Sequence, residues 1–211
     1  MKTDELIAFL ARGAGPAPSA TVARRLVPMA LLGLLISAAV ALAAYGPLRA
    51  DTLPAAVVLM KFGYAAALAA AAGWLTARLA RPVARLGAPA RFAGSVLLLM
   101  AMLAFVTWLR VPEAERAAAL FGSSWLSCPW NVLALSLPAL AGVLWAVQGL
   151  APTRLRAAGF ASGLLAGSLG ALGYALACPE ASAAFVAFWY TLGILLSGGL
   201  GAWLGPRVLR W

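Results

Sequence analysis

The stretch Pro28–Tyr45, PMALLGLLISAAVALAAY, contains no Asp, Glu, Lys or Arg, and it decides the class of fold. A helix needs about 20 mostly apolar residues to cross a bilayer, and this stretch is close to that length. Other stretches of the same kind follow it at Leu53–Thr76, Phe92–Leu109, Trp130–Gln148, Ala157–Ala177 and Ala184–Leu204. The sequence therefore predicts an all-α integral membrane protein, folded as a bundle of six transmembrane helices.

The overall composition supports this class. Of the 211 residues, 64% are hydrophobic and 10% are charged, whereas a soluble domain has about 45–50% apolar and roughly 25% charged residues. The chain contains no histidine, which excludes a histidine-ligated metal, a histidine-ligated haem and a His-based catalytic triad. We therefore expect neither an enzyme nor a resident cofactor.

Positive charge is distributed unevenly between the loops. If the N-terminus is cytoplasmic, the same side also holds most of the basic residues, namely Lys2, Arg12, Arg24, Arg25, Arg78, Arg81, Arg85, Arg91, Arg154, Arg156, Arg207 and Arg210. The opposite side holds Arg49, Arg110 and Arg116. Because Lys and Arg accumulate in cytoplasmic loops, both termini are expected in the cytoplasm. The net charge of +10 thus indicates orientation in a lipid bilayer, and direct DNA binding is not expected.

These spans divide the chain into three parts. Residues 1–27 form a cytoplasmic tail, residues 28–206 the transmembrane domain, and residues 207–211 a short cytoplasmic C-terminus. Small residues recur at four-residue spacing in the fifth and sixth spans, as at Gly163 and Gly167, which lets helix backbones approach closely. We expect these two spans to pack against each other or against a partner subunit.

Two stretches, SCPWN and ACPEA, hold both cysteines of the chain, Cys128 and Cys178, each followed by a proline, Pro129 or Pro179. In the expected topology both thiols lie outside, at the N-termini of the fourth and sixth helices. Proline is favoured at the first helical position, so each cysteine is interpreted as a cap residue. Free N–H groups and the helix dipole lower the pKa of a thiol there. The pattern predicts paired, accessible and activated thiols on one face of the membrane.

Three interpretations of the cysteines stay open. A structural disulfide would form by default in the oxidising compartment outside a bacterial inner membrane. A redox- or metal-responsive pair is the functional alternative, and two unrelated buried thiols are the third. Zinc usually takes four ligands, so two sulfurs better suit a transient, soft heavy-metal ion.

Lys61 is the one Asp, Glu, Lys or Arg inside an expected span. Its long side chain is expected to reach the outer interface or to pair with an external carboxylate. A functional role is the alternative, because charges within the membrane are rare and often functional. In the external loop, residues 112–121 are expected to form a short surface helix.

The N-terminal residues MKTDELIAFLARG form a separate motif. Thr3 can cap a helix, and Asp4 and Glu5 suit its positive end. An apolar stripe at helical spacing follows, made of Leu6, Ile7, Phe9 and Leu10. A helix this short needs a partner, which is either the inner membrane surface or a cytoplasmic protein.

The chain resembles the NrsF family, named for negative regulator of sigma F. The resemblance covers essentially the whole chain and lies in MKTDELIAFLARG, the six spans, SCPWN, ACPE and the segment FWYTLGILL at Phe188–Leu196. It implies a bacterial inner-membrane anti-sigma factor that holds an extracytoplasmic-function (ECF) sigma factor inactive. It also implies that Cys128 and Cys178 sense a periplasmic heavy-metal or oxidative signal. The contact with the sigma factor is assigned to the tail from its position and amphipathicity.

Other functions remain open. A membrane thiol–disulfide oxidoreductase commonly uses a Cys-x-x-Cys pair, which this chain lacks. A small transporter is disfavoured because its spans normally carry several ionisable groups. A structural subunit of a larger complex is compatible with the sequence, and so is an oligomer.

Overall fold

The computed structural model describes residues 3–13, 21–48, 53–81, 87–150 and 152–210, and only the backbone of residues 10–13. The described elements are α1 (Thr3–Gly13), α2 (Thr21–Tyr45), α3 (Ala55–Leu79), α4 (Gly87–Leu109), η1 (Glu113–Glu115), α5 (Arg116–Phe121), α6 (Cys128–Gln148), α7 (Leu155–Ala175), α8 (Ala183–Phe185), η2 (Val186–Tyr190) and α9 (Thr191–Val208). Within these described ranges, six helices are long and apolar enough to cross a membrane when α8 to α9 is taken as one. The predicted all-α class and the predicted spans are confirmed, and membrane insertion stays a prediction.

Several helices extend beyond the predicted spans. The first spanning helix, α2, begins at Thr21 and contains Pro28, the residue predicted to start it. The third, α4, begins at Gly87, before the predicted start at Phe92. Apolar composition marks the part of a helix that lies in hydrocarbon, whereas helical hydrogen bonding continues into polar surroundings. The sequence pattern therefore underestimates the length of these helices.

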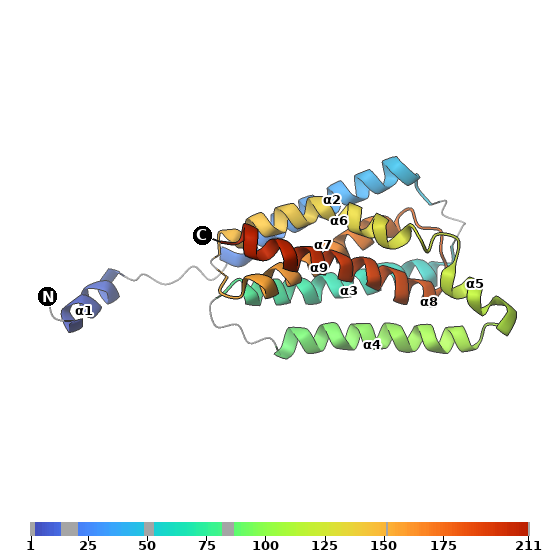
Figure 1. The fold of residues 1–211 in the computed structure, drawn as a ribbon, viewed down its shortest axis with the longest axis horizontal. Helices are drawn as coiled ribbons and strands as arrows, with labels where there is room; N and C mark the ends of the chain where they lie inside the picture. The colour runs from blue at the N-terminus through green and yellow to red at the C-terminus, as the bar shows by residue number, and fades with distance from the viewer. Residues whose placement is uncertain (1–2, 14–20, 49–52, 82–86, 151, 211) are drawn as a thin grey trace.

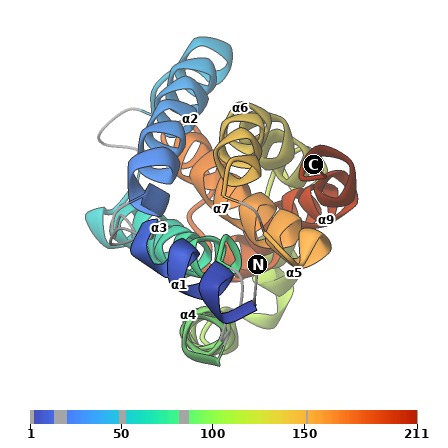
Figure 2. The ribbon, with the colours of Figure 1, turned by 90° about the vertical axis from the view of Figure 1, so that its left-hand side faces the viewer.

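Helix α7 occupies the centre of the bundle (Figures 1 and 2). It contacts α9, α6, α3 and α2. In its most apolar stretch 67% of the residues are buried, compared with 11% in α4, which lies at the edge of the bundle. A movement of α7 would therefore change its packing against these four helices.

Glycines bring α7 and α9 into backbone contact, as the small-residue spacing predicted. A Cβ atom on Gly163 would lie 2.8 Å from the Cα of Gly198, and one on Gly201 would lie 2.9 Å from the Cα of Gly163. Distances below 3.0 Å do not occur for real Cβ atoms, so a side chain at these positions would force the helices apart. This close approach allows dispersion contacts along the whole crossing.

The sixth span is interrupted by a π-helical turn. Helix α8 runs into this turn, η2, which continues directly into α9. The turn holds Trp189, whose indole Nε1 donates to the Leu120 carbonyl at 2.9 Å, and the fully buried Tyr190. Such turns shift the helical register by one residue, which here directs both rings inward near the loops.

Both segments predicted to form short helices are helical, and their placement relative to a membrane stays a prediction. The loop after α4 contains η1 and α5, within the predicted segment 112–121. In the tail, α1 has its acidic residues Asp4 and Glu5 in the first turn. Figure 1 shows α1 apart from the bundle, beyond the end at which the C-terminus lies.

Candidate functional site

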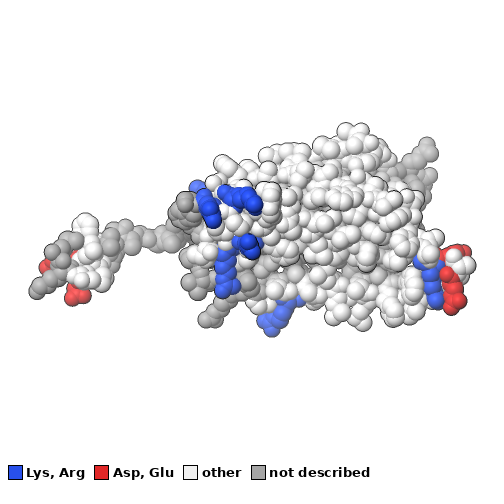
Figure 3. All heavy atoms as spheres, viewed as in Figure 1, with Lys and Arg blue, Asp and Glu red and all other residues white. Residues whose placement is uncertain are grey.

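The two ends of the bundle differ in charge. Figure 3 shows the Lys and Arg side chains gathered mainly at the end nearest α1. The acidic side chains visible on the bundle lie at the opposite end, where Glu113 pairs with Arg116 at 3.5 Å. Cys128 begins α6 at this second end, and Cys178 follows α7 there. We call this second end the cysteine end.

Cys128 is the first residue of α6, and Pro129 occupies the first turn. The helix extends from a preceding turn, in which the Cys128 N–H donates to the Ser124 carbonyl at 2.8 Å. Ser127 therefore occupies the cap position and Cys128 is the first residue inside the helix, so the predicted cap role of Cys128 is wrong. Its side chain is 0% exposed.

Cys178 does not cap the sixth helix, so this part of the prediction is wrong. Its N–H donates to the Tyr174 carbonyl at 3.0 Å, which ties it to the end of α7. The next helix begins only at Ala183, where the Ser182 hydroxyl accepts from the Phe185 N–H at 3.4 Å. Serine provides the side-chain acceptor that a cap requires, and the exposed Pro179 lies in the connecting segment.

The predicted accessibility of the thiols is also wrong. Cys128 and Cys178 are both free and both 0% exposed. They belong to one buried cluster that includes Tyr174 and Tyr190. The Tyr190 hydroxyl lies beside Cys178, and no described residue forms a hydrogen bond with it by distance and angle. The thiols are therefore enclosed by side chains, and a reagent could reach them only after this end opens.

Lys61 lies in α3 and is 1% exposed, although a lysine at a lipid or water interface would be more exposed. Its ammonium donates to the Cys178 backbone carbonyl at 2.8 Å, so neither expected arrangement is observed. Both thiols and the Glu180 carboxylate are within electrostatic range of this ammonium. The charge is directed toward the cysteines because α3 packs against α7, whose end carries Cys178.

Glu180 links the two cysteine segments. One of its carboxylate oxygens accepts from the Ser123 N–H at 2.8 Å and from the Ser123 hydroxyl at 2.7 Å. The same oxygen accepts from the Ser124 N–H at 3.1 Å and hydroxyl at 3.0 Å. We call this arrangement the Glu180 clasp. Partial burial alone would raise the pKa of Glu180, but these hydrogen bonds outweigh it and hold the pKa below its usual value.

Gly122 allows the clasp to close. Its φ of +55° lies in the left-handed region that favours glycine, and a Cβ there would collide with the Glu180 carboxylate. Aromatic rings pack around the same segment, since the ring centroids of Trp125 and Trp189 lie 5.4 Å apart. Phe121 contacts both rings. The segment before Cys128 is thus held to the segment after Cys178 by polar and apolar contacts.

The α1 helix presents an apolar surface. Leu6, Ile7 and Phe9 are 40%, 59% and 73% exposed. Asp4 and Glu5 are also exposed, and the side chain of Leu10 lies outside the described residues. An exposed apolar stripe on a short helix is suited to bind a protein groove or a membrane surface.

Comparison with known proteins shows which family this chain resembles. The family described as "NrsF: Negative regulator of sigma F" matches residues 10–211. The chain belongs to the NrsF family. The resemblance predicted from the sequence is thereby confirmed. An NrsF relative from Azospira oryzae, called a probable anti-sigma-F factor, is 40% identical over 215 residues, which cover 100% of both chains. The anti-sigma-F factor NrsF of Caulobacter vibrioides is 39% identical over 218 residues, again covering 100% of both chains. No solved structure matches this NrsF chain.

Sequence reasoning placed both cysteines of this NrsF chain at one end, and they share one buried cluster. It missed the Glu180 clasp and the position of Tyr190. A signal for the clasp was present, because Glu180 follows Cys178 closely and Ser123 and Ser124 precede Cys128. The contact itself joins residues 57 positions apart, which no local pattern reveals.

Proposed function

We propose that the chain is a membrane-embedded anti-sigma factor that holds an ECF sigma factor at the cytoplasmic face and releases it on a periplasmic signal. The observation that carries this proposal is the full-length similarity to two anti-sigma-F factors. The architecture fits the role, because the central helix α7 contacts four other long helices and is suited to transmit a change from one end of the bundle to the other. The partner is a sigma factor, and the bilayer is the surrounding medium.

We call the end of the bundle nearest α1, where most Lys and Arg side chains gather (Figure 3), the arginine-rich end. The proposed orientation places this end in the cytoplasm of a bacterium and the cysteine end in the periplasm. Exposed arginines near the ends of α2, α3, α7 and α9 support it, including Arg24, Arg78, Arg156 and Arg207. Basic residues near span ends are retained on the cytoplasmic side. Both termini would then be cytoplasmic, with α1 in reach of a soluble partner.

The docking element in this proposal is α1. Leu6, Ile7 and Phe9 would enter an apolar groove of the sigma factor, with Leu10 completing the predicted stripe. Asp4 and Glu5 would lie at the rim and contact basic side chains. A short helix gains most of its stability from such a partner, so binding and helix formation would be coupled.

Sensing would take place at Cys128 and Cys178. A soft heavy-metal ion would bind two thiolates after both thiols release their protons. Alternatively, a thiol oxidant would accept two electrons as two protons leave and one S–S bond forms. The described residues hold no cluster of three or more metal-binding side chains, which fits a two-sulfur site better than a tetrahedral one. The Lys61 ammonium would stabilise the negative charge of either thiolate.

Either event would require the Glu180 clasp to open, because both thiols are buried. The new sulfur link would then hold α6 and the end of α7 in a changed relative position. Since α7 contacts four other long helices, the change would reach their arginine-rich ends. A tenfold release of the sigma factor requires only about 1.4 kcal/mol of differential interaction between two conformations.

Replacement of Cys128 and Cys178 by serine, singly and together, tests the sensor with a sigma-dependent reporter. We expect normal repression without signal and loss of induction by a thiol-reactive heavy-metal salt or by a thiol oxidant. Ser127→Ala is the matched control, because this exposed serine adjoins Cys128, and it should respond normally. Full induction in the double variant would exclude the cysteines as sensors and leave the anti-sigma role intact.

A further inference from the structure

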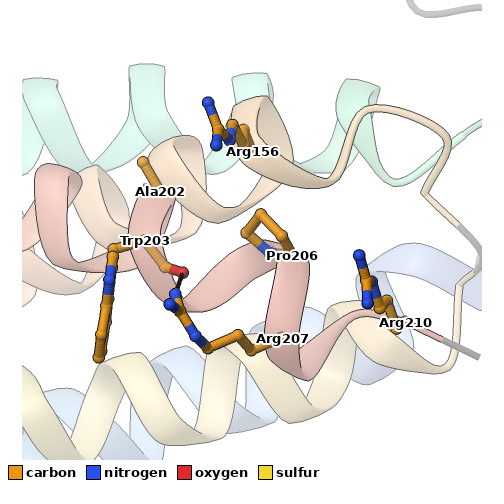
Figure 4. A pocket seen from close by; sticks show the side chains of 6 residues that line it. All are labelled: Arg156, Ala202, Trp203, Pro206, Arg207 and Arg210. Carbon is orange, nitrogen blue, oxygen red and sulfur yellow. Dashed lines mark hydrogen bonds between the residues drawn. The ribbon is translucent and has the colours of Figure 1, made fainter.

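A basic hollow lies between the start of α7 and the end of α9, at the arginine-rich end of the bundle (Figure 4). Its volume is about 750 Å³, and the described residues that line it are Arg156, Ala202, Trp203, Pro206, Arg207 and Arg210. None of these residues is acidic. Three arginines therefore line one hollow, and none of its described lining residues offers a carboxylate to offset their mutual repulsion.

The glycine contact between α7 and α9 fixes this hollow. A Cβ on Gly159 would lie 2.9 Å from the Cα of Gly205, so the two backbones touch within one turn of Arg156 and Arg207. Figure 4 shows Arg156 rising from α7 and Arg207 from α9. The arginines come from two helices that cannot separate without losing their tightest contact, which keeps the hollow in place.

Contacts within the hollow preorganise it for an anion. The Arg207 guanidinium stacks 4.1 Å from the Trp203 ring centroid, and its Nη1 donates to the Trp203 carbonyl at 2.7 Å. The remaining N–H groups of this guanidinium have no hydrogen-bond partner among the described residues and can bind phosphate oxygens in pairs. Pro206 has no N–H, so the Ala202 carbonyl lacks its usual helical donor and can accept from a ligand hydroxyl.

We propose that this hollow binds the headgroup of an anionic phospholipid in the cytoplasmic leaflet. The inference rests on the proposed membrane placement and not on sigma-factor binding. Basic pockets between spanning helices on the cytoplasmic side suit phosphate headgroups, and tryptophan favours the same interface. A diacyl phosphatidylglycerol has the required chemistry, with one phosphate for the arginines and glycerol hydroxyls for the Ala202 carbonyl.

The surface next to the hollow favours a lipid over a protein or a free anion. Leu192, Leu195 and Trp203 are 36%, 47% and 57% exposed and share one face of α9. This apolar face leads away from the hollow along the expected span, where acyl chains would lie against it. A soluble anion would make no apolar contact with this face. An acidic protein surface would contact the hollow but would not extend along a face that lies in the expected span.

The test uses the full-length protein in detergent, titrated with dioleoylphosphatidylglycerol and followed by native mass spectrometry. The triple variant Arg156→Gln, Arg207→Gln and Arg210→Gln should bind this lipid at least about tenfold more weakly, since each basic group near an anionic headgroup contributes roughly fivefold. The control triple Arg24→Gln, Arg78→Gln and Arg91→Gln removes the same charge from exposed positions outside the hollow and should retain the affinity. Thermal melting confirms that both triples are folded.

Further arms identify the ligand. Inorganic phosphate and glycerophosphoglycerol should compete poorly, and phosphatidylcholine should bind weakly to the wild type. Equal losses in both triples, or no loss in the first, would overturn the proposal. Competition by inorganic phosphate as strong as by the lipid would assign the hollow to a soluble anion instead. Loss of sigma-factor capture with unchanged lipid affinity would assign it to a protein partner.

Discussion

One oxygen atom of Glu180 accepts four hydrogen bonds and holds the segments of both cysteines together. The carboxylate can do this because it is ionised and because Gly122 leaves room for it. Hydrogen bonds to a charged group contribute about 1.5–3 kcal/mol, compared with about 0.5–1.5 kcal/mol for neutral ones. We therefore expect the protonation state of this single side chain to control access to the buried thiols.

Glu180→Gln should expose the thiols. The amide keeps an acceptor oxygen but loses the charge, and a loss of about 1.4 kcal/mol in local opening free energy corresponds to about tenfold faster labelling. Membrane-impermeant maleimide on intact cells measures this rate. Glu115→Gln removes an exposed carboxylate from the same end and should label at the wild-type rate. Equal labelling rates in the two variants would show that the Glu180 clasp does not control access to the thiols.

Acid should have the same effect as Glu180→Gln. Because the pKa of Glu180 is lowered in the folded protein, the clasp contributes its full stability above the ordinary Glu pKa of about 4.3. That stability is lost as the pH falls through the lower, folded-state pKa. Labelling of the purified protein by dithiodipyridine, which reacts in acid, should accelerate only in this range. The Glu180→Gln variant should show no such acceleration.

At the scale of helices, the crossing of α7 and α9 depends on the absence of side chains. Gly163→Ala places a methyl group 2.8 Å from the Gly198 Cα and should destabilise the bundle by about 1–3 kcal/mol through overpacking. A Cβ on Gly199 would meet nothing within 4 Å, so Gly199→Ala should be neutral or slightly stabilising. Thermal melting in detergent compares the two, and similar melting temperatures would contradict the packing argument.

The α1 helix supports a prediction about binding. Phe9→Asp introduces a charge into the exposed apolar stripe and should weaken capture of the sigma factor by at least about tenfold, since burying an unpaired carboxylate costs several kcal/mol. Ala8→Asp adds the same charge about 100° away from both Ile7 and Phe9, off the stripe, and should bind normally. Pull-down with the detergent-solubilised protein measures both. Equal capture of the sigma factor by the two variants would show that the apolar stripe of α1 is not the docking surface.

At the scale of the whole molecule, orientation decides the meaning of both ends. The native thiols are buried, so topology is better tested in a Cys128→Ser, Cys178→Ser background. Ala114→Cys lies in the loop before α5 and should react with impermeant maleimide in intact cells, whereas Thr153→Cys, in the loop before α7, should react only after lysis. Both positions are exposed. The reverse result would invert the proposed orientation.

The spans and the tail helix could be predicted because both depend on local properties. Pro28–Tyr45 must be helical if it crosses a bilayer as a single segment. Within the hydrocarbon core only a helix pairs the backbone N–H and C=O groups of one segment with each other. The boundaries were predicted less well, as at α4, because helices continue past the apolar segment. The pattern at Cys178 was misleading, because proline is favoured both at helix starts and in connecting segments.

The sequence by itself determined the number and order of the long apolar helices, the amphipathic tail and the family, because hydropathy and motif spacing are properties of contiguous residues. Only the tertiary structure decided that Cys128 and Cys178 are buried, that Lys61 donates to a backbone carbonyl and that Glu180 closes over Ser123. These contacts join residues far apart in the chain. Their energies depend on distance and burial, which are set only when the helices pack.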